Sequence, residues 1–534
     1  MACVVAGFAA LAVLLTWPLA AHLGTVGRAD NGDGRISIWN VAWVARTLVV
    51  DPLHVFDANI FYPHRWTLAY SESNLGAGLL AVPVYWLTGS PVAAHNFVLL
   101  LSFVLAATGT YYLVRYLAGD RQAAAIAATC FAFCPYLFAH IPHIQLLMTA
   151  GLPFSMLAFH RLADAPTPRR GAVLGLTMAA QALLCGYYAV FVALMIGVAV
   201  LIVAAVRRRW TDVRYWMAIS VAAGVAILFA LPLLAPYLGL QRATGFQRPL
   251  DAAREWSAHW RTYIASSSSV HARLLRVTGP SIEQLFPGVV ALVFGVAGLA
   301  IGWAARDRRR EVAILYGALA ALAFWASFGP AGGLYRVLYA AVPVFSLMHA
   351  PGRFGVVATF ALSVLAGLAI TALLKKTSRP LLATVVLLAL TVIELRVPLS
   401  FPPVPPVDEA YRVLATLPRG AVIEMPVFSR RFAFARTQYM LSSTAHWMPL
   451  VNAYSDFTPQ DFTDNLEALG GFPSRESFAI LSRDHVRYAV FHLDLFNAAA
   501  RLDVLARLRE FDRYLVRRYG DDRIVLYEIV GTPP

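Results

Sequence analysis

The sequence predicts an α-helical polytopic membrane protein with a small α/β domain at its C-terminal end. Of its 534 residues, 59% are hydrophobic and only 14% are charged, whereas soluble globular proteins carry about 25% charged residues. Apolar segments near the roughly 20 residues that cross a bilayer recur through the first three-quarters of the chain. The last quarter is more polar, so we expect it to lie outside the membrane.

Eleven apolar segments are predicted to span the membrane. They cover residues 3–21, 96–117, 121–139, 144–162, 171–187, 189–206, 215–238, 286–304, 312–328, 353–374 and 380–397. The first segment has the position of a signal peptide. It lacks a basic start and its apolar run is long, so it is interpreted as a retained helix.

The distribution of Arg and Lys predicts the orientation of these segments. Residues 400–534 contain 15 Arg and 16 acidic residues, a net charge of −1, so the first 399 residues carry +15. Much of this excess lies in short loops between apolar segments, as is typical of cytoplasmic loops, and no nucleic-acid partner is predicted. These loops contain Arg169-Arg170, Arg207–Arg209, Arg306 with Arg308–Arg310, and Lys375-Lys376 with Arg379. We therefore predict a cytoplasmic N-terminus and an extracytoplasmic C-terminal domain.

Three further amphipathic or apolar segments are too short to span, or contain Gly or Pro. Residues 36–50 interleave Trp39 and Trp43 with polar side chains, which predicts an interfacial helix. If residues 75–88 and 334–348 crossed the membrane, the basic loops would no longer all lie on the cytoplasmic side. These two segments are therefore interpreted as interfacial or re-entrant pieces.

A proline-rich linker separates the two predicted domains. Pro398–Pro406 contains five prolines in nine residues, which forbids a regular helix. We predict a transmembrane domain over residues 1–399, with external loops at 22–95 and 239–285, and an extracytoplasmic α/β domain over residues 400–534. In that domain the pattern predicts strands at 421–428, 488–494 and 523–530 and helices at 408–416, 461–469, 475–483 and 498–511.

The first external loop contains two candidate catalytic acids, Asp30 and Asp33, in the segment Arg28-Ala-Asp-Asn-Gly-Asp-Gly-Arg35. A carboxylate held at the membrane face can take a proton from an acceptor hydroxyl. Asn-Gly and Asp-Gly are also turn-forming pairs, so the segment could simply precede the interfacial helix. A third interpretation is a partial calcium-binding loop, but the acidic residue required at the far end of such a loop is absent.

Polar side chains also gather at two later external turns. His140, His143 and Gln145 could bind a sugar or a metal ion. Tyr187 lies at the tip of the next predicted helical hairpin, on the same external side. Polarity at helix ends and the aromatic belt of membrane proteins are the competing explanations.

Basic residues in the later external loops indicate a site for an anion. Arg353 stands with His349 in His-Ala-Pro-Gly-Arg-Phe at the start of a predicted span, where an arginine is costly unless it is paired or functional. Arg248 lies in loop 239–285, which ends near Glu283. Several guanidinium groups near the outer surface suit a phosphate group, although a solvated basic loop would contain the same residues.

The layout resembles the GT-C superfamily of membrane glycosyltransferases. The resemblance covers most of the chain and rests on about eleven spans, a long acidic first loop with interfacial helices, and an external C-terminal domain. Some sequence segments resemble those of a bacterial branch of multi-spanning proteins, which are assigned as glycosyltransferases by similarity alone. They are Asp33 followed by Ile38-Trp39-Asn40, the segment His140–Gln145, Leu285–Gly288, and His349–Phe354.

The resemblance implies a multi-pass protein of the bacterial plasma membrane that transfers a sugar from a polyprenyl-phosphate donor to a glycan, lipid or protein. It further implies that Asp33 or Asp30 is the general base and that Arg353, Arg248 and His349 bind the donor phosphate. No cofactor is predicted with certainty, a divalent metal stays open, and the oligomeric state is not predicted. The alternatives are a lipid or glycan transporter or flippase, which the broken helices would also fit, and a non-catalytic component of envelope polysaccharide assembly.

Overall fold

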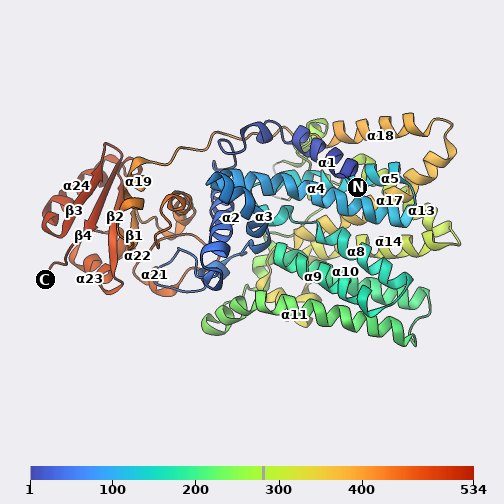
Figure 1. Cartoon of the computed structure of the whole chain (residues 1–534), viewed down its shortest axis with the longest axis horizontal. Helices are drawn as coiled ribbons and strands as arrows, with labels where there is room; N and C mark the ends of the chain where they lie inside the picture. The colour runs from blue at the N-terminus through green and yellow to red at the C-terminus, as the bar shows by residue number, and fades with distance from the viewer. Residues whose placement is uncertain (1, 280–282) are drawn as a thin grey trace. The chain divides into compact units, whose positions relative to one another are not determined.

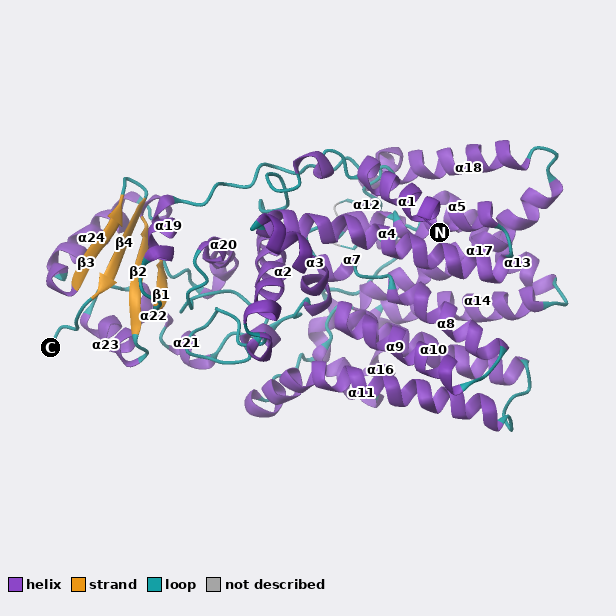
Figure 2. Cartoon of the chain, in the orientation of Figure 1, coloured by secondary structure: helices purple, strands orange, loops and turns teal. Residues whose placement is uncertain are grey.

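The computed structural model describes residues 2–279 and 283–534, and it is mostly helical with one small sheet (Figure 2). The chain divides into two compact units. The first, here called the helical unit, comprises Met1–Ala21, Phe97–Ala235 and Gly245–Ser400. The second, here called the mixed unit, comprises His22–Asn96, Pro236–Thr244 and Phe401–Pro534.

The helical unit contains most of the long helices labelled in Figure 1. Two of its helices, α4 (Pro91–Ala118) and α11 (Val213–Thr244), continue into the mixed unit. Its other helices are α1 (Ala2–Leu15), α5 (Arg121–Ala132), α6 (Pro135–Ala139), α7 (Ile144–Leu147), α8 (Gly151–Asp164), α9 (Pro168–Leu184), α10 (Gly186–Val206), α12 (Ala272–Thr278), α13 (Val289–Ala304), α14 (Arg308–Ser327), α15 (Gly329–Gly332), α16 (Leu334–Ala341), α17 (Gly355–Lys376) and α18 (Pro380–Leu395).

Each of the eleven predicted spans falls on helical chain. Within residues 2–279 and 283–534, seven helices are long and apolar enough to cross a membrane, and four apolar helices of 10–17 residues accompany them. A multi-pass membrane protein is therefore confirmed, while the count of eleven spans stays a prediction.

Prolines explain where the helices depart from the predicted segments. The first helix ends at Leu15 rather than residue 21 because Pro18 cannot continue it. The segment 121–139 is divided into α5 and α6, and Pro135 is the first residue of α6. The segment 334–348 is helical in α16 only as far as Ala341, before Pro343.

Glycines allow close helix packing in the helical unit. A Cβ added at Gly171 or Gly175 on α9 would lie 2.3 or 2.5 Å from a carbonyl oxygen of α11. A Cβ at Gly298 on α13 would lie 1.9 Å from the carbonyl oxygen of Leu365 on α17. Small residues at such positions let backbones approach where no hydrophobic effect drives helices together in lipid.

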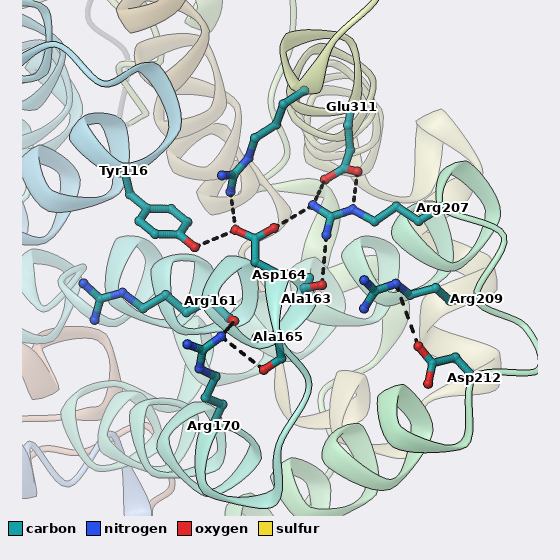
Figure 3. Close-up of polar contacts among 11 residues, drawn as sticks. Tyr116, Arg161, Ala163, Asp164, Ala165, Arg170, Arg207, Arg209, Asp212 and Glu311 are labelled. Carbon is teal, nitrogen blue, oxygen red and sulfur yellow. Dashed lines mark hydrogen bonds and ion pairs between the residues drawn. The ribbon is translucent and has the colours of Figure 1, made fainter.

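A polar cluster joins four helix ends of the helical unit (Figure 3). Asp164, the last residue of α8, accepts hydrogen bonds from Tyr116, Arg207 and Arg308. Arg207 also donates to Glu311, with Nε–Oε2 at 2.6 Å and Nη2–Oε1 at 2.7 Å. Because these side chains come from α4, α8, α14 and the residue after α10, the four ends lie together. The predicted alternation of loops places all four on one side.

The mixed unit contains α2 (Gly32–Val50), α3 (Leu75–Thr88) and a four-stranded sheet. Its strands are β1 (Ala421–Met425), β2 (Val486–His492), β3 (Leu515–Gly520) and β4 (Ile524–Ile529), in the order β1-β2-β4-β3. The β1–β2 pair is parallel and the other two pairs are antiparallel. The predicted α/β character of this region is confirmed.

Strand β3 is the one strand that the sequence pattern does not reveal. Arg517 and Arg518 interrupt its apolar alternation, and both side chains are exposed. Charged side chains on an edge strand hinder pairing with another chain, so the same residues that hide the strand in the sequence protect its edge.

The helices around the sheet follow the prediction closely. The predicted helix 461–469 is divided in two, whereas the other three differ from the prediction by at most one residue at an end. The helices of this region are α19 (Glu409–Thr416), α20 (Thr437–Ser442), α21 (Gln460–Asp464), α22 (Leu466–Gly470), α23 (Arg475–Arg483) and α24 (Ala498–Glu510). Of these, α20 was not predicted.

The first loop and the C-terminal residues share buried contacts inside the mixed unit. The Asn59 side chain donates to Ser443 Oγ and to the Met448 carbonyl, each at 3.1 Å. The Leu450 backbone N–H donates to the Asn59 carbonyl, and the Leu450 carbonyl accepts from the Tyr62 N–H. The structure therefore groups residues 22–96 with the C-terminal residues, whereas the sequence suggested one boundary near residue 400.

Candidate functional site

Arg353 is the centre of a polar site in the helical unit. It lies on the short helix η8 (Pro351–Phe354), directly before α17. Its guanidinium carbon is 4.4 Å from the ring centroid of Tyr187, which is a cation–π contact. Its Nε atom is buried and has no hydrogen-bond partner among the residues that the structure describes. A buried donor of this kind is costly unless a ligand accepts its hydrogen bond.

Tyr187 and His349 hold the other side of this arginine. The His349 backbone N–H donates to the Tyr187 hydroxyl oxygen at 2.9 Å, and that hydroxyl lies 3.0 Å from His349 Nδ1. The rings of Trp256 and His349 meet edge to face at 5.9 Å. The Gly352 N–H donates to the Trp256 carbonyl at 2.9 Å. These contacts fix the backbone on either side of Arg353.

Glu283 and His140 lie close together in the same unit. His140 Nε2 and Glu283 Oε2 are 3.5 Å apart, and both side chains are buried. A Cβ added at Gly352 would lie 2.9 Å from the Trp256 carbonyl oxygen and 3.1 Å from Glu283 Cγ, so Trp256 and Glu283 both pack closely on the Arg353 segment.

Burial shifts the titration of three of these groups. Burial raises the pKa of the Glu283 carboxyl to about 7, although Arg353 and His143 oppose the shift. Burial lowers the pKa of His140 to about 3, and nearby His143 lowers it further. Burial, then Arg248 and Arg353, lower the pKa of His349 to about 3. The site therefore contains permanent positive charge on Arg, neutral imidazoles at His140 and His349, and an acid that changes charge near neutral pH.

Arg248 adds a second guanidinium group near His349. Its backbone N–H donates to the Ser346 carbonyl at 2.8 Å, and its own carbonyl accepts from Tyr339 at 2.9 Å. Two arginines of one site, with few acids beside them, favour an anionic ligand.

The structure brings together most of the residues that the sequence singled out in this part of the chain. His143 is linked to His140, with their rings 6.1 Å apart. Gln145 lies on α7 in the next turn, and within the described chain its side chain makes no hydrogen bond to the others. No three or more His, Cys, Asp or Glu side chains in the described ranges are placed to hold a metal ion. We derive no step that involves a metal.

Two residues of this site escaped the sequence analysis. Trp256 contributes a carbonyl and a ring edge, and the Tyr136 ring packs at a tilt against His140 with ring centroids 4.3 Å apart. The Tyr136 hydroxyl lies 3.1 Å from that of Tyr188. Both Trp256 and Tyr136 look like ordinary aromatic residues of a membrane protein in the sequence, and no local pattern distinguishes them.

The two candidate acids lie in the mixed unit at the start of α2. This helix begins at Gly32, four residues before the predicted start, and Asn31 caps it by accepting from the Gly34 N–H at 2.8 Å. A Cβ at Gly34 would lie 1.7 Å from the Arg28 carbonyl oxygen. The segment is therefore a tight turn into a helix, and Asp33 lies in the first helical turn, where a negative charge is favoured.

Asp30 and Asp33 differ in their surroundings. Asp30 pairs with Arg28, with Nε–Oδ1 at 2.9 Å. Partial burial raises the pKa of Asp30, but the hydrogen bonds and the charge of Arg28 outweigh this effect and lower the pKa below its usual value. A carboxylate with a lowered pKa is a weaker general base. The Asp33 side chain is partly exposed.

Comparisons with known proteins identify the fold. No family model and no curated protein matches the sequence. The structure is similar to the cryo-EM structure of the arabinofuranosyltransferase AftD from mycobacteria, with 17% identity and a TM-score of 0.58. The match covers 99% of this chain, which spans 41% of the AftD chain. Similarity at this level of identity shows that the two chains share a fold.

Two structures of ArnT from Cupriavidus metallidurans were also found, one without ligand and one bound to undecaprenyl phosphate. Each aligns over 99% of both chains at 14% identity, with a TM-score of 0.42. Similarity at this level adds no argument about the present chain.

Proposed function

We propose that this protein is a glycosyltransferase that moves a sugar from a polyprenyl-phosphate donor to an acceptor hydroxyl on the extracytoplasmic face. The observation that carries the proposal is Arg353. It is a partly buried cation at the start of a membrane helix, its Nε atom has no partner among the described residues, and a second arginine lies in the same site. An arginine in such a position supports binding of a phosphate at the membrane surface.

The reaction we propose is a single displacement at the anomeric carbon. The acceptor hydroxyl oxygen bonds to that carbon as the bond to the phosphate oxygen breaks, and the configuration inverts. The phosphate oxygen keeps the bonding electron pair, and Arg353, with Arg248, stabilises the negative charge that develops there. The hydroxyl proton passes to a first-loop carboxylate, with Asp33 preferred over Asp30.

The other polar residues have supporting roles in this proposal. His349 is held neutral and orients Tyr187 under the Arg353 guanidinium. His140, His143, Gln145, Tyr187 and Glu283 are proposed to contact the donor sugar or its phosphate. The identity of the sugar, hexose or pentose, is left to experiment.

The direct test is transfer in a defined membrane. The full-length protein in nanodiscs is supplied with synthetic polyprenyl-phosphate sugars and a panel of hydroxyl acceptors, and release of polyprenyl phosphate is followed with product formation. We expect release that depends on acceptor. Movement of the intact donor across a proteoliposome bilayer without release would instead identify a flippase, and the proposal would be wrong.

The proposed orientation places the N-terminus in the cytoplasm and the C-terminal residues outside. The five short loops assigned to the cytoplasm, with the adjacent helix ends, hold sixteen basic and five acidic side chains between Arg115 and Arg379. We expect a reporter that is active only in the periplasm to work when fused after Pro534 and to be silent after Arg209. The reverse pattern would contradict the orientation.

Glu283 should give donor binding a pH dependence. Its pKa is raised to about 7, so the carboxyl is neutral in acid and becomes charged as the pH rises through neutrality. The new negative charge would repel the donor phosphate, so the donor KM of the wild-type protein should rise severalfold from about pH 6 to pH 8. Glu283→Gln should give a donor KM that is low and nearly independent of pH.

Protein stability gives an independent check on the same group. Because the pKa of Glu283 is raised on folding, the folded protein favours the neutral carboxyl over the charged carboxylate. The stability that this group contributes is therefore lost as the pH rises through about 7. The thermal stability of Glu283→Gln, relative to the wild type, should therefore be greater at pH 8 than at pH 6. Glu255→Gln, an exposed acid of the same loop, is the matched control. Parallel pH profiles of the wild-type and Glu283→Gln proteins would rule out this role.

A further inference from the structure

A C-terminal segment of the mixed unit packs on the turn that carries Asp33. The segment is η9 (Arg430–Arg436), and its Phe434 ring lies against Gly32. A Cβ added at Gly32 would lie 2.4–2.7 Å from the Cε1, Cζ and Cδ1 atoms of that ring. Phe434 therefore lies next to the residue that precedes the proposed base.

The Phe434 ring is not buried by this contact. Its residue is 39% exposed, and its ring meets that of Tyr454 edge to face at 5.0 Å. Phe432, two residues earlier, is 59% exposed, and Arg430 and Arg431 are exposed beside it. Exposure of large aromatic surface is unfavourable in water, by about 25 cal/mol for each Å², and grouped aromatic exposure marks binding surfaces.

The segment is held firmly in this position. Arg436 at its end is only 2% exposed, donates from Nε to the Phe428 carbonyl at 3.1 Å, and lies over the Phe462 ring at 5.0 Å. The following helix α20 packs against α2 (Figure 2), and its Leu441 packs on Ile38. The exposed ring and the Asp33 turn therefore belong to one packed body rather than to a free loop.

We propose that Phe434, with Tyr454 at its edge, forms an acceptor subsite that binds a sugar ring beside Asp33. The inference rests on the proposed function, because it takes Asp33 as the group that receives the acceptor proton. The C–H face of a pyranose or furanose ring is a suitable partner for the electron-rich face of an aromatic ring. A sugar stacked on Phe434 would present a hydroxyl to the start of α2. The acceptor class is therefore a glycan rather than an alcohol without a ring.

The subsite is tested by binding and by kinetics on the full-length protein in nanodiscs. The probes are methyl glycosides of common hexoses and pentoses, with glycerol as a hydroxyl compound that lacks a ring. Saturation-transfer NMR should show contact with the sugar ring protons in the wild-type protein. Phe434→Leu should weaken that signal and raise the acceptor KM roughly three- to tenfold, with the donor KM unchanged. Phe434→Trp should restore both.

Phe432→Leu is the matched control, because it removes an exposed ring from the same helix that does not contact Gly32. It should leave the acceptor KM unchanged. Equal effects of the Phe432 and Phe434 changes on acceptor KM would overturn the assignment. Lower thermal stability of both variants with an unchanged acceptor KM would also overturn it, and would assign the two rings a structural role.

Two outcomes separate this inference from the proposed function. If Asp33→Asn abolishes transfer while Phe434→Leu leaves sugar contact and acceptor KM unchanged, the subsite is wrong and the function stands. If sugar contact depends on Phe434 but no donor is ever cleaved, the chain binds glycans without transferring them. The structural contact has its own check. The stability cost of Gly32→Ala should be smaller in a Phe434→Ala background, because the clash with the ring is then absent.

Discussion

Arg353→Gln is expected to reduce sugar transfer roughly 10²–10³-fold, which is the typical cost of removing one group that stabilises developing charge. The loss should fall mainly on kcat, because the charge on the departing phosphate is greatest in the transition state. Arg353→Lys keeps the charge but not the planar fork that donates hydrogen bonds to two phosphate oxygens, so it should recover activity only in part.

The same substitution should leave the fold intact. The Nε atom of Arg353 has no hydrogen-bond partner among the described residues, so its removal breaks no hydrogen bond at that atom. What is lost is the cation–π contact with Tyr187, worth on the order of 1 kcal/mol, and the attraction between the guanidinium group and the Glu283 carboxyl. Transfer rates and thermal unfolding should be measured on the same nanodisc preparation, with Arg261→Gln, an exposed arginine of the external loop, as the control. Near-normal kcat in Arg353→Gln would remove the phosphate site from the mechanism.

The helical part of the fold could be predicted well because a bilayer imposes a simple rule. Apolar length alone locates α10 and α17, and the Gly-Pro composition of residues 75–88 marks the short helix α3. Local breaks are harder to predict, since Pro135 divides one span while Pro232 and Pro236 leave α11 continuous. Whether a proline ends a helix depends on how neighbouring groups satisfy the freed backbone, and one sequence does not show this.

The site could be predicted only where a residue is conspicuous in its local context. Arg353 stands out because a charge at the start of an apolar helix is rare. Phe434 does not, because an isolated phenylalanine in a polar domain is unremarkable in sequence. Its position on Gly32 depends on packing between residues about four hundred apart in the chain. The sequence favoured Asp33 over Asp30 only by its position at the start of the predicted interfacial helix, and the ion pair between Asp30 and Arg28 is a contact that the sequence did not predict.

Asp33→Asn is expected to lower transfer by about 10²–10⁴-fold, the usual cost of losing a general base. The change keeps the size of the side chain and removes its ability to accept a proton at neutral pH. Folding should survive, because the cap of α2 is the Asn31 side chain and not Asp33. The lost charge in the first helical turn should cost only about 0.3–1 kcal/mol. Transfer and thermal unfolding of the variant at matched membrane abundance are the measurements.

Asp30→Asn serves as the comparison, because it makes the same chemical change three residues away. Asp30 is already paired with Arg28 and its pKa is lowered, so we expect its loss to reduce transfer only severalfold. A turn-forming role for both residues predicts instead that asparagine is tolerated at each, since asparagine serves such turns as well as aspartate. Near-normal transfer in both variants would therefore exclude the first-loop acids from the chemistry. A large loss in Asp30→Asn alone would move the general base to Asp30, and the Arg28 pair would then have to open during the reaction.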